Sequence, residues 1–110
     1  MNTEIGKVIR DQVEAWNRGD VEAFCASYAL NAVYLMRDGP VHGREAIRAL
    51  YRSRFGAEMG HLTVLTEVID IIGDAAFVQV RWTIDDATGV ALLGFRKDPD
   101  GWKIGWDATL

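Results

Sequence analysis

The sequence is poor in the residues that build disulfides and metal sites. It has a single cysteine, Cys25, and two histidines, His42 and His61, among 110 residues. One cysteine cannot form a disulfide within the chain, and the two histidines lie too far apart in the sequence for a recognisable zinc-ligand spacing. We therefore expect no disulfide and no metal site, and chemistry that needs no cofactor.

Long apolar runs and clusters of basic residues are also missing. No segment approaches the roughly 20 consecutive apolar residues that span a membrane. The N-terminal segment MNTEIGKVIRDQ is charged and amphipathic, unlike a signal peptide. The formal net charge is −4 and only one short stretch is dense in arginine, which argues against nucleic-acid binding. These absences predict a cytoplasmic protein whose partners include neither a membrane nor a nucleic acid.

The composition is that of one ordinary globular domain. Apolar residues make up 49% of the chain and charged residues 25%, with both signs spread along it. A chain of this length can bury one core but is too short for two domains. We therefore treat residues 1–110 as a single domain without a disordered tail.

The first half of the sequence has the apolar periodicity of helices. An apolar stripe at three- and four-residue steps, from Ile5 to Trp16, predicts a helix near the N-terminus. Gly19 can close this helix in the left-handed conformation, and Asp20 can cap a short second helix. A third amphipathic helix is predicted in REAIRALYRSRFGAEM, residues 44–59.

The second half has the periodicity of strands. Four long strands are predicted, HLTVLTEVIDII, AAFVQVRWTI, VALLGFRK and GWKIGWDATL, joined by GD, DDATG and DPDG. These joints have the composition of hairpin turns and predict an antiparallel meander. A shorter strand, AVYLM, is predicted before the third helix. Helices followed by a long antiparallel sheet give an α+β fold in which the helices cover one face of the sheet.

Four segments together resemble the SnoaL-like branch of the nuclear-transport-factor-two-like superfamily. They are AWNRGDVEAFCASYALNAVYLM, VHGREAIRALYRSRF, GDAAFVQVRWTI and DGWKIGWDAT, and their order matches over nearly the whole chain. The resemblance implies a single SnoaL-like domain over residues 1–110, with three N-terminal helices packed into a strongly bent antiparallel sheet. This cystatin-like cone would hold an internal pocket and form a homodimer through the outer face of the sheet.

The resemblance is informative about the fold and much less so about function. The superfamily includes steroid isomerases, polyketide cyclases, epoxide hydrolases, dehydratases and non-enzymatic association domains. The positions that carry the helix-one tyrosine, the base aspartate and the second oxyanion-hole acid of the steroid isomerases correspond here to Gln12, Met36 and Leu93. None of these side chains can do that proton chemistry, which argues against a classical steroid isomerase.

Asp107 is the candidate acid or base. Alternation along the last strand puts Gly105 and Asp107 on one face and Trp102, Ile104 and Trp106 on the other. The resemblance assigns the face of Asp107 to the cavity and the tryptophan face to the subunit contact. A carboxylate in apolar surroundings is suited to general acid or base catalysis. The alternative is an exposed or salt-bridged aspartate.

Arg81 is the candidate partner of that carboxylate. The resemblance turns Gln79 and Arg81 into the cavity and leaves Trp82 on the outer face of the sheet. A buried Arg81 requires a carboxylate or an anionic ligand, and Asp107 would be the nearest partner. A tight pair would lower the pKa of Asp107 and oppose its catalytic role. The alternatives are a buried ion pair without function and an arginine at the subunit contact.

The expected cavity wall is apolar and aromatic, which suits a small, flat molecule. Its expected residues are Trp16, Tyr28, Tyr34, Met36, Tyr51, Phe55, Met59, Leu62, Gln79, Leu93 and Phe95. Core packing is the alternative for each of them. Two functions stay open. One is a cofactor-free isomerase, cyclase or hydrolase that uses Asp107 as acid or base, and the other is a non-catalytic module that binds an apolar or carboxylate-bearing ligand or assembles into oligomers.

Overall fold

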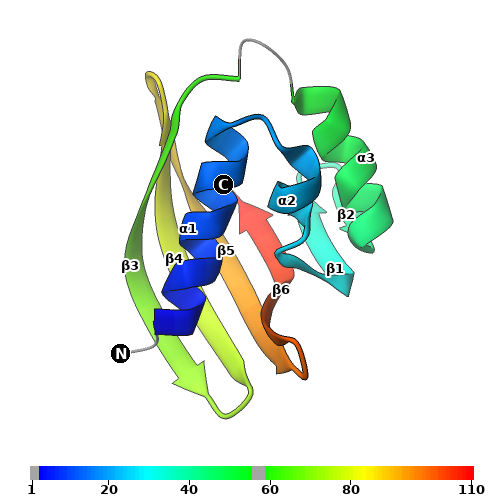
Figure 1. Cartoon of the computed structure of the whole chain (residues 1–110), viewed down its shortest axis with the longest axis vertical. Helices are drawn as coiled ribbons and strands as arrows, with labels where there is room; N and C mark the ends of the chain where they lie inside the picture. Colours follow the sequence, from blue (N-terminus) through cyan, green and yellow to red (C-terminus); the bar gives the residue numbers. More distant parts are fainter. Residues whose placement is uncertain (1–2, 56–58) are drawn as a thin grey trace.

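The computed structural model describes residues 3–55 and 59–110, which form three helices and six strands (Figure 1). The elements are α1 (Thr3–Asn17), α2 (Val21–Cys25), β1 (Tyr28–Met36), β2 (Gly39–His42), α3 (Arg44–Arg54), β3 (Leu62–Ile72), β4 (Ala75–Ile84), β5 (Ala87–Asp98) and β6 (Gly101–Thr109). The predicted α+β fold is confirmed. No helix within these residues is both long enough and apolar enough to cross a bilayer.

The six strands form one curved, unclosed sheet in the order β2-β1-β6-β5-β4-β3. The antiparallel meander of β3 to β6 is as predicted. The sheet is not antiparallel throughout, because β1 runs parallel to β6. One helix and four strands separate β1 from β6 in the sequence, so no hairpin turn fixes their relative direction. The turn-rich segment after β1 also forms the edge strand β2.

Tight turns set the register of the meander. Two residues, Gly73 and Asp74, connect β3 to β4, and Gly73 has the positive φ of 60° that a short hairpin requires. Gly101, after the β5–β6 turn, has a φ of 110°. Both turns match the prediction. The middle turn is shorter than predicted, because Asp85 takes a left-handed φ of 51° and lets β5 begin at Ala87.

The three helices lie on one face of the sheet, and the core lies between them (Figure 1). Gly19, with φ 73°, follows α1, and the Asp20 carboxylate accepts a 3.0 Å hydrogen bond from the Ala23 amide at the start of α2. Both capping predictions are confirmed. The tight corner packs Phe24 of α2 against Tyr51 of α3, with ring centroids 4.7 Å apart. The helices thereby enclose the inner face of the sheet.

A β-bulge in β6 decides which side chains face inward. Ile104 pairs with Phe95 and Trp106 with Gly94, so Gly105 is an extra residue between two successive pairs. Trp102 and Ile104 are buried before the bulge, whereas Asp107 is buried and Trp106 is 50% exposed after it. Strict alternation predicted Trp102 and Ile104 on the outer face, and that prediction is wrong because the bulge reverses the order of the faces.

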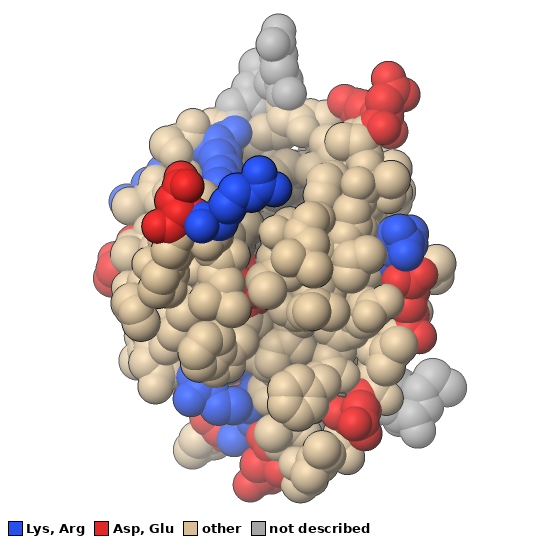
Figure 2. All heavy atoms as spheres, turned by 180° about the vertical axis from the view of Figure 1, so that it is seen from behind, with Lys and Arg blue, Asp and Glu red and all other residues tan. Residues whose placement is uncertain are grey.

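The outer face of the sheet is apolar and carries few charges near its centre. Figure 2 shows this face from behind, with most of the acidic and basic side chains at its margins. A shallow groove of about 480 Å³ crosses it. The exposed apolar side chains that line this outer groove are Leu35, Val68, Phe77, Leu92 and Trp106. Exposed apolar surface of this kind on a monomer usually marks a contact site.

Candidate functional site

A cavity of about 200 Å³ lies between the helices and the inner face of the sheet. All three helices, β1 and β3 to β6 contribute to its wall. The lining residues are Gln12, Trp16, Phe24, Tyr28, Tyr34, Tyr51, Arg54, Leu62, Val64, Val80, Trp82, Ile84, Ala91, Leu93, Asp107 and Thr109. Most of the wall is apolar or aromatic, so a polar group inside it stands out.

Asp107 is that polar group. Asp107 is only 4% exposed, and it is the single buried acidic or basic residue among those that the structure describes. The Tyr28 hydroxyl donates a 2.6 Å hydrogen bond to Asp107 Oδ2, and the Thr109 hydroxyl donates a 2.9 Å bond to Oδ1. Tyr28 opens β1 and pairs with Ile104, three positions before Asp107 on the neighbouring strand β6, so the pairing of these strands brings the two side chains within reach.

Burial sets the protonation of this group. Desolvation raises the pKa of the Asp107 carboxyl above its ordinary 3.8, and the hydrogen bonds from Tyr28 and Thr109 partly oppose the rise. Burial, and then the negative charge of Asp107, raise the pKa values of Tyr28 and Tyr51 well above 10. Both tyrosines therefore remain protonated hydrogen-bond donors at neutral pH, whereas Asp107 can exchange a proton nearer to neutrality.

Aromatic rings form much of the cavity wall. The Trp16 indole donates a 3.2 Å hydrogen bond to the Gly60 carbonyl, which ties α1 to the start of β3. Trp82 lies close over Gly89, where an added Cβ would come within 2.5 Å of the indole. Its indole nitrogen is buried and has no hydrogen-bond partner within the part of the chain described. A ligand in the cavity would meet ring faces on several sides.

Arg81 does not enter the cavity. Its side chain is 45% exposed on the outer face of β4, where Nε lies 3.1 Å from Glu67 Oε2. Gln79 bonds the other oxygen of the same carboxylate, at 3.1 Å. The inward face of β4 carries Val78, Val80 and the half-buried Trp82 instead. The predicted inward orientation of Arg81 and Gln79 is therefore wrong. The alternating apolar residues of β4 face the helices, which leaves the polar residues of the strand on the outer face.

The Arg81–Asp107 pair that would have lowered the pKa of Asp107 therefore does not form. Among the described residues, none of the ion pairs includes Asp107. The carboxyl is held by two neutral hydroxyls, which stabilise its ionised form less than a cation would.

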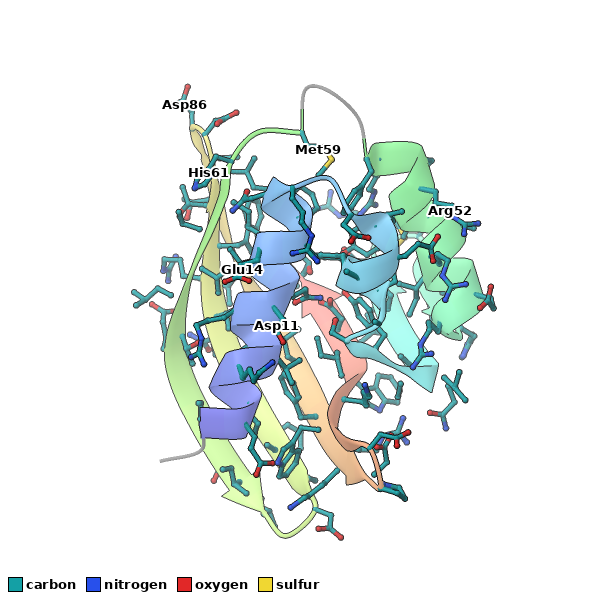
Figure 3. All side chains as sticks on the ribbon, viewed as in Figure 1. Asp11, Glu14, Arg52, Met59, His61 and Asp86 are labelled. Carbon is teal, nitrogen blue, oxygen red and sulfur yellow. The ribbon has the colours of Figure 1, made fainter. Side chains whose placement is uncertain are left out.

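The structure brings together six of the eleven expected lining residues: Trp16, Tyr28, Tyr34, Tyr51, Leu62 and Leu93. Phe95 is fully buried in the core further along β5, and the half-buried Met36 and Phe55 pack against the same core. Gln79 lies along the outer groove. Met59 lies on the connection that leads into β3 and is not part of the lining (Figure 3). Phe95, Met36 and Phe55 serve packing because the cavity occupies only part of the space between helices and sheet.

Arg54 is a lining residue that the sequence prediction missed. It follows Tyr51 by three positions and Ile47 by seven, so helical spacing places it on the inward face of α3. That spacing was a usable signal, but arginines at positions 44, 48 and 52 made the charged residues of this helix look uniformly exposed. Figure 3 shows Arg52 pointing away from the core. Trp82 was missed because the face of β4 was misassigned.

The fold and the cavity define the molecule as a nuclear-transport-factor-two-like α+β domain. The SnoaL-like domain model matches residues 9–107, and the chain belongs to that family. No curated protein matches the sequence. The fold itself recurs in many solved structures.

Three solved structures illustrate the likeness. An NTF-2 like protein of unknown function from Shewanella oneidensis MR-1 has 28% identity and a TM-score of 0.89, over 97% of this chain and 96% of that one. A domain of unknown function with a cystatin-like fold from Nostoc punctiforme has 20% identity and a TM-score of 0.81, over 99% and 77%. A ketosteroid isomerase-like protein from Erwinia carotovora atroseptica has 20% identity and a TM-score of 0.75, over 97% and 92%. At these identities the last two are similar in fold alone.

Proposed function

We propose that the protein binds a small, largely apolar molecule in its cavity. Without a cofactor, Asp107 then removes a proton from this molecule and returns it at another position. The observation that carries this proposal is a buried carboxyl, facing an aromatic cavity, with no cationic partner among the described residues. A group whose pKa is raised toward neutrality by burial is suited to accept a proton in one step and return it in another. Isomerisation, cyclisation and hydration all fit this requirement.

The chemistry follows from the surroundings of the carboxylate. In its ionised form Asp107 is a base held in place by Tyr28 and Thr109, so a substrate proton can transfer to a fixed oxygen. The apolar wall excludes water that would otherwise stabilise the ionised form and weaken it as a base. A cavity of about 200 Å³ is smaller than the roughly 300–1,000 Å³ of sites for drug-sized ligands, which favours a compact substrate.

Non-catalytic ligand binding is the second candidate. It is favoured by the fact that both oxygens of Asp107 already accept hydrogen bonds from side chains of the protein. An aspartate so engaged can serve as a fixed acceptor for a hydroxyl of the ligand and transfer no proton. The two candidates share the cavity and differ only in whether a proton moves.

Solvent deuterium exchange distinguishes these two candidates. Small cyclic ketones, tested in heavy water by NMR, would exchange the hydrogens next to the carbonyl when a base removes them. We expect the wild-type protein to accelerate this exchange on at least one such ketone. Asp107→Asn should reduce the acceleration by about 100-fold or more, since a positioned base contributes about 10²–10⁴.

Glu67→Gln is the matched control, because Glu67 is a carboxylate on the outer face of the sheet. It should leave the exchange unchanged. Unchanged exchange in Asp107→Asn would exclude Asp107 as the base. Saturable binding of these ketones without any exchange would favour the non-catalytic role.

We also propose that the protein forms a homodimer through the outer face of its sheet. The outer groove presents Phe77 at 62% exposure and Trp106 at 50%. A second copy would cover both rings with the same apolar face, as a two-fold symmetric contact requires. This contact would leave the cavity, on the opposite face of the sheet, open to ligand.

A further inference from the structure

Arg54 is the cationic side chain among the residues that line the cavity. It is the last residue of α3 and is exposed, so it lies at the open side of the cavity. Its guanidinium carbon lies 5.5 Å from the Tyr51 ring centroid and 6.0 Å from that of Tyr34. Attraction between the guanidinium and these ring faces keeps the charge at the cavity rather than in open solvent.

The other arginines of α3 are engaged elsewhere. Arg44 donates a 2.8 Å hydrogen bond to the Tyr28 carbonyl, and Arg48 pairs with Glu45 at 2.9 Å. Arg52 pairs with Glu22 on α2. Arg54, in contrast, forms no ion pair with any carboxylate among residues 3–55 and 59–110. Its guanidinium therefore keeps its hydrogen-bond donors for another acceptor.

We propose that Arg54 binds the carboxylate group of the cavity ligand. This inference rests on the proposed function, because it requires that the cavity take up a ligand. Asp107 repels a negative charge at the inner end of the cavity, so an anionic group is favourable only beside Arg54. The ligand class is then a compact, flat molecule with a carboxylate at the cavity mouth. Its other end, which faces Asp107, carries a neutral hydroxyl or carbonyl.

The planar guanidinium explains the choice of a carboxylate. It can donate two parallel hydrogen bonds to the two oxygens of one carboxylate, a geometry that an ammonium group does not offer. The aromatic rings beside it, from Tyr34 and Tyr51, and the Trp16 ring elsewhere in the cavity wall suit a ring attached to that carboxylate. A phosphate monoester is also an anion that a guanidinium can bind, but it is bulkier than a carboxylate. The affinities of the two anions are therefore compared directly.

The test compares 3-hydroxybenzoate with its neutral counterpart 3-hydroxybenzamide, and with 3-hydroxyphenyl phosphate as the third probe. Affinities are measured by NMR titration at low and high salt. We expect wild type to prefer the benzoate over the amide by about five- to tenfold at low salt. High salt should reduce that preference. Arg54→Gln should abolish this preference, because glutamine carries no charge and cannot donate the two parallel hydrogen bonds of a guanidinium.

Arg52→Gln is the matched control, since it removes an arginine from the same helix turn that points away from the cavity. It should retain the wild-type preference. Equal benzoate-to-amide ratios in wild type and Arg54→Gln would overturn the role of Arg54 while leaving the cavity function intact. Tighter binding of the phosphate than the benzoate would overturn the assignment of a carboxylate. Failure of all three probes to bind wild type would contradict the proposed cavity function and this inference with it.

Discussion

At the level of single residues, the buried carboxyl of Asp107 should make stability depend on pH. Its pKa is raised above 3.8 in the folded chain, so the folded state binds more protons than the unfolded state between the two pKa values. The contribution of Asp107 to the free energy of unfolding is therefore fully present below pH 3.8. It is lost as the pH rises through the raised pKa of the folded state. We expect Asp107→Asn, which has no such titration, to gain in stability relative to wild type as pH increases from 4 to 8. Urea unfolding across this range measures the difference, and a constant difference would contradict the assignment.

The hydrogen bond from Tyr28 should contribute more to stability than the one from Thr109. Tyr28 is fully buried, and Tyr28→Phe leaves Asp107 Oδ2 without a donor. We expect a loss of about 1–3 kcal/mol in the free energy of unfolding. Thr109→Val should cost less, because Thr109 is exposed and water can replace its hydroxyl. Urea denaturation of both variants at pH 7 measures the two losses in the free energy of unfolding. Equal losses would contradict the prediction.

At the level of the secondary-structure elements, two glycines in the last strands should tolerate alanine very differently. An added Cβ on Gly89 would lie 2.5 Å from the Trp82 ring and 2.6 Å from the Leu110 carbonyl. We expect Gly89→Ala to cost about 1–3 kcal/mol because neither neighbour can yield easily. On Gly105 the nearest atoms to the Cβ would be those at the exposed end of Arg96, which can move away.

Gly105→Ala is therefore the matched control and should cost less than about 1 kcal/mol, mainly through the Arg96–Asn31 hydrogen bond. Thermal unfolding of the two variants measures the contrast. A larger loss in Gly105→Ala than in Gly89→Ala would show that the bulge, and not the contact of Trp82 with Gly89, has the stricter steric requirement.

Local signals in the sequence were sufficient for the helices, the meander and two of the three turns. Gly19 and Gly73 act through their own backbone, and the Asp20 side chain caps an amide three residues away, so these local conformations can be predicted from residue type. The parallel pairing of β1 with β6 depends on the whole chain. The bulge at Gly105 has no distinct pattern of residues, since one glycine in a strand is also compatible with regular pairing.

The same limits explain the outcome for the candidate site. Asp107 could be identified because it is the carboxylate among apolar residues near the end of the last strand. Its neighbour Tyr28 lies 79 positions away in the sequence, and only the β1–β6 pairing joins them. Arg81 was assigned inward by resemblance, whereas the apolar periodicity of its own strand favoured the outward position that the structure shows.

At the level of the whole molecule, the apolar outer face predicts a dimer that single charges should disrupt. We expect wild type to elute at twice the mass of the chain in size-exclusion chromatography with light scattering. Trp106→Lys should convert it to monomer, because a lysine would be buried without a partner at the centre of the contact. Leu30→Lys is the control, since Leu30 is 76% exposed and lies outside the outer groove. A monomeric wild type at tens of micromolar would contradict the dimer.

Burial of Asp107 in the cavity raises its pKa, and the proposed proton transfer depends on that raised pKa. An NMR titration of the side-chain carboxyl carbon of Asp107, assigned by its loss in Asp107→Asn, measures that pKa directly. We predict a value clearly above 3.8 in wild type, and a higher one in Tyr28→Phe because a hydrogen bond that stabilises the ionised form is removed. A pKa at or below 3.8 would contradict the placement of Asp107 as a buried acid or base in the cavity.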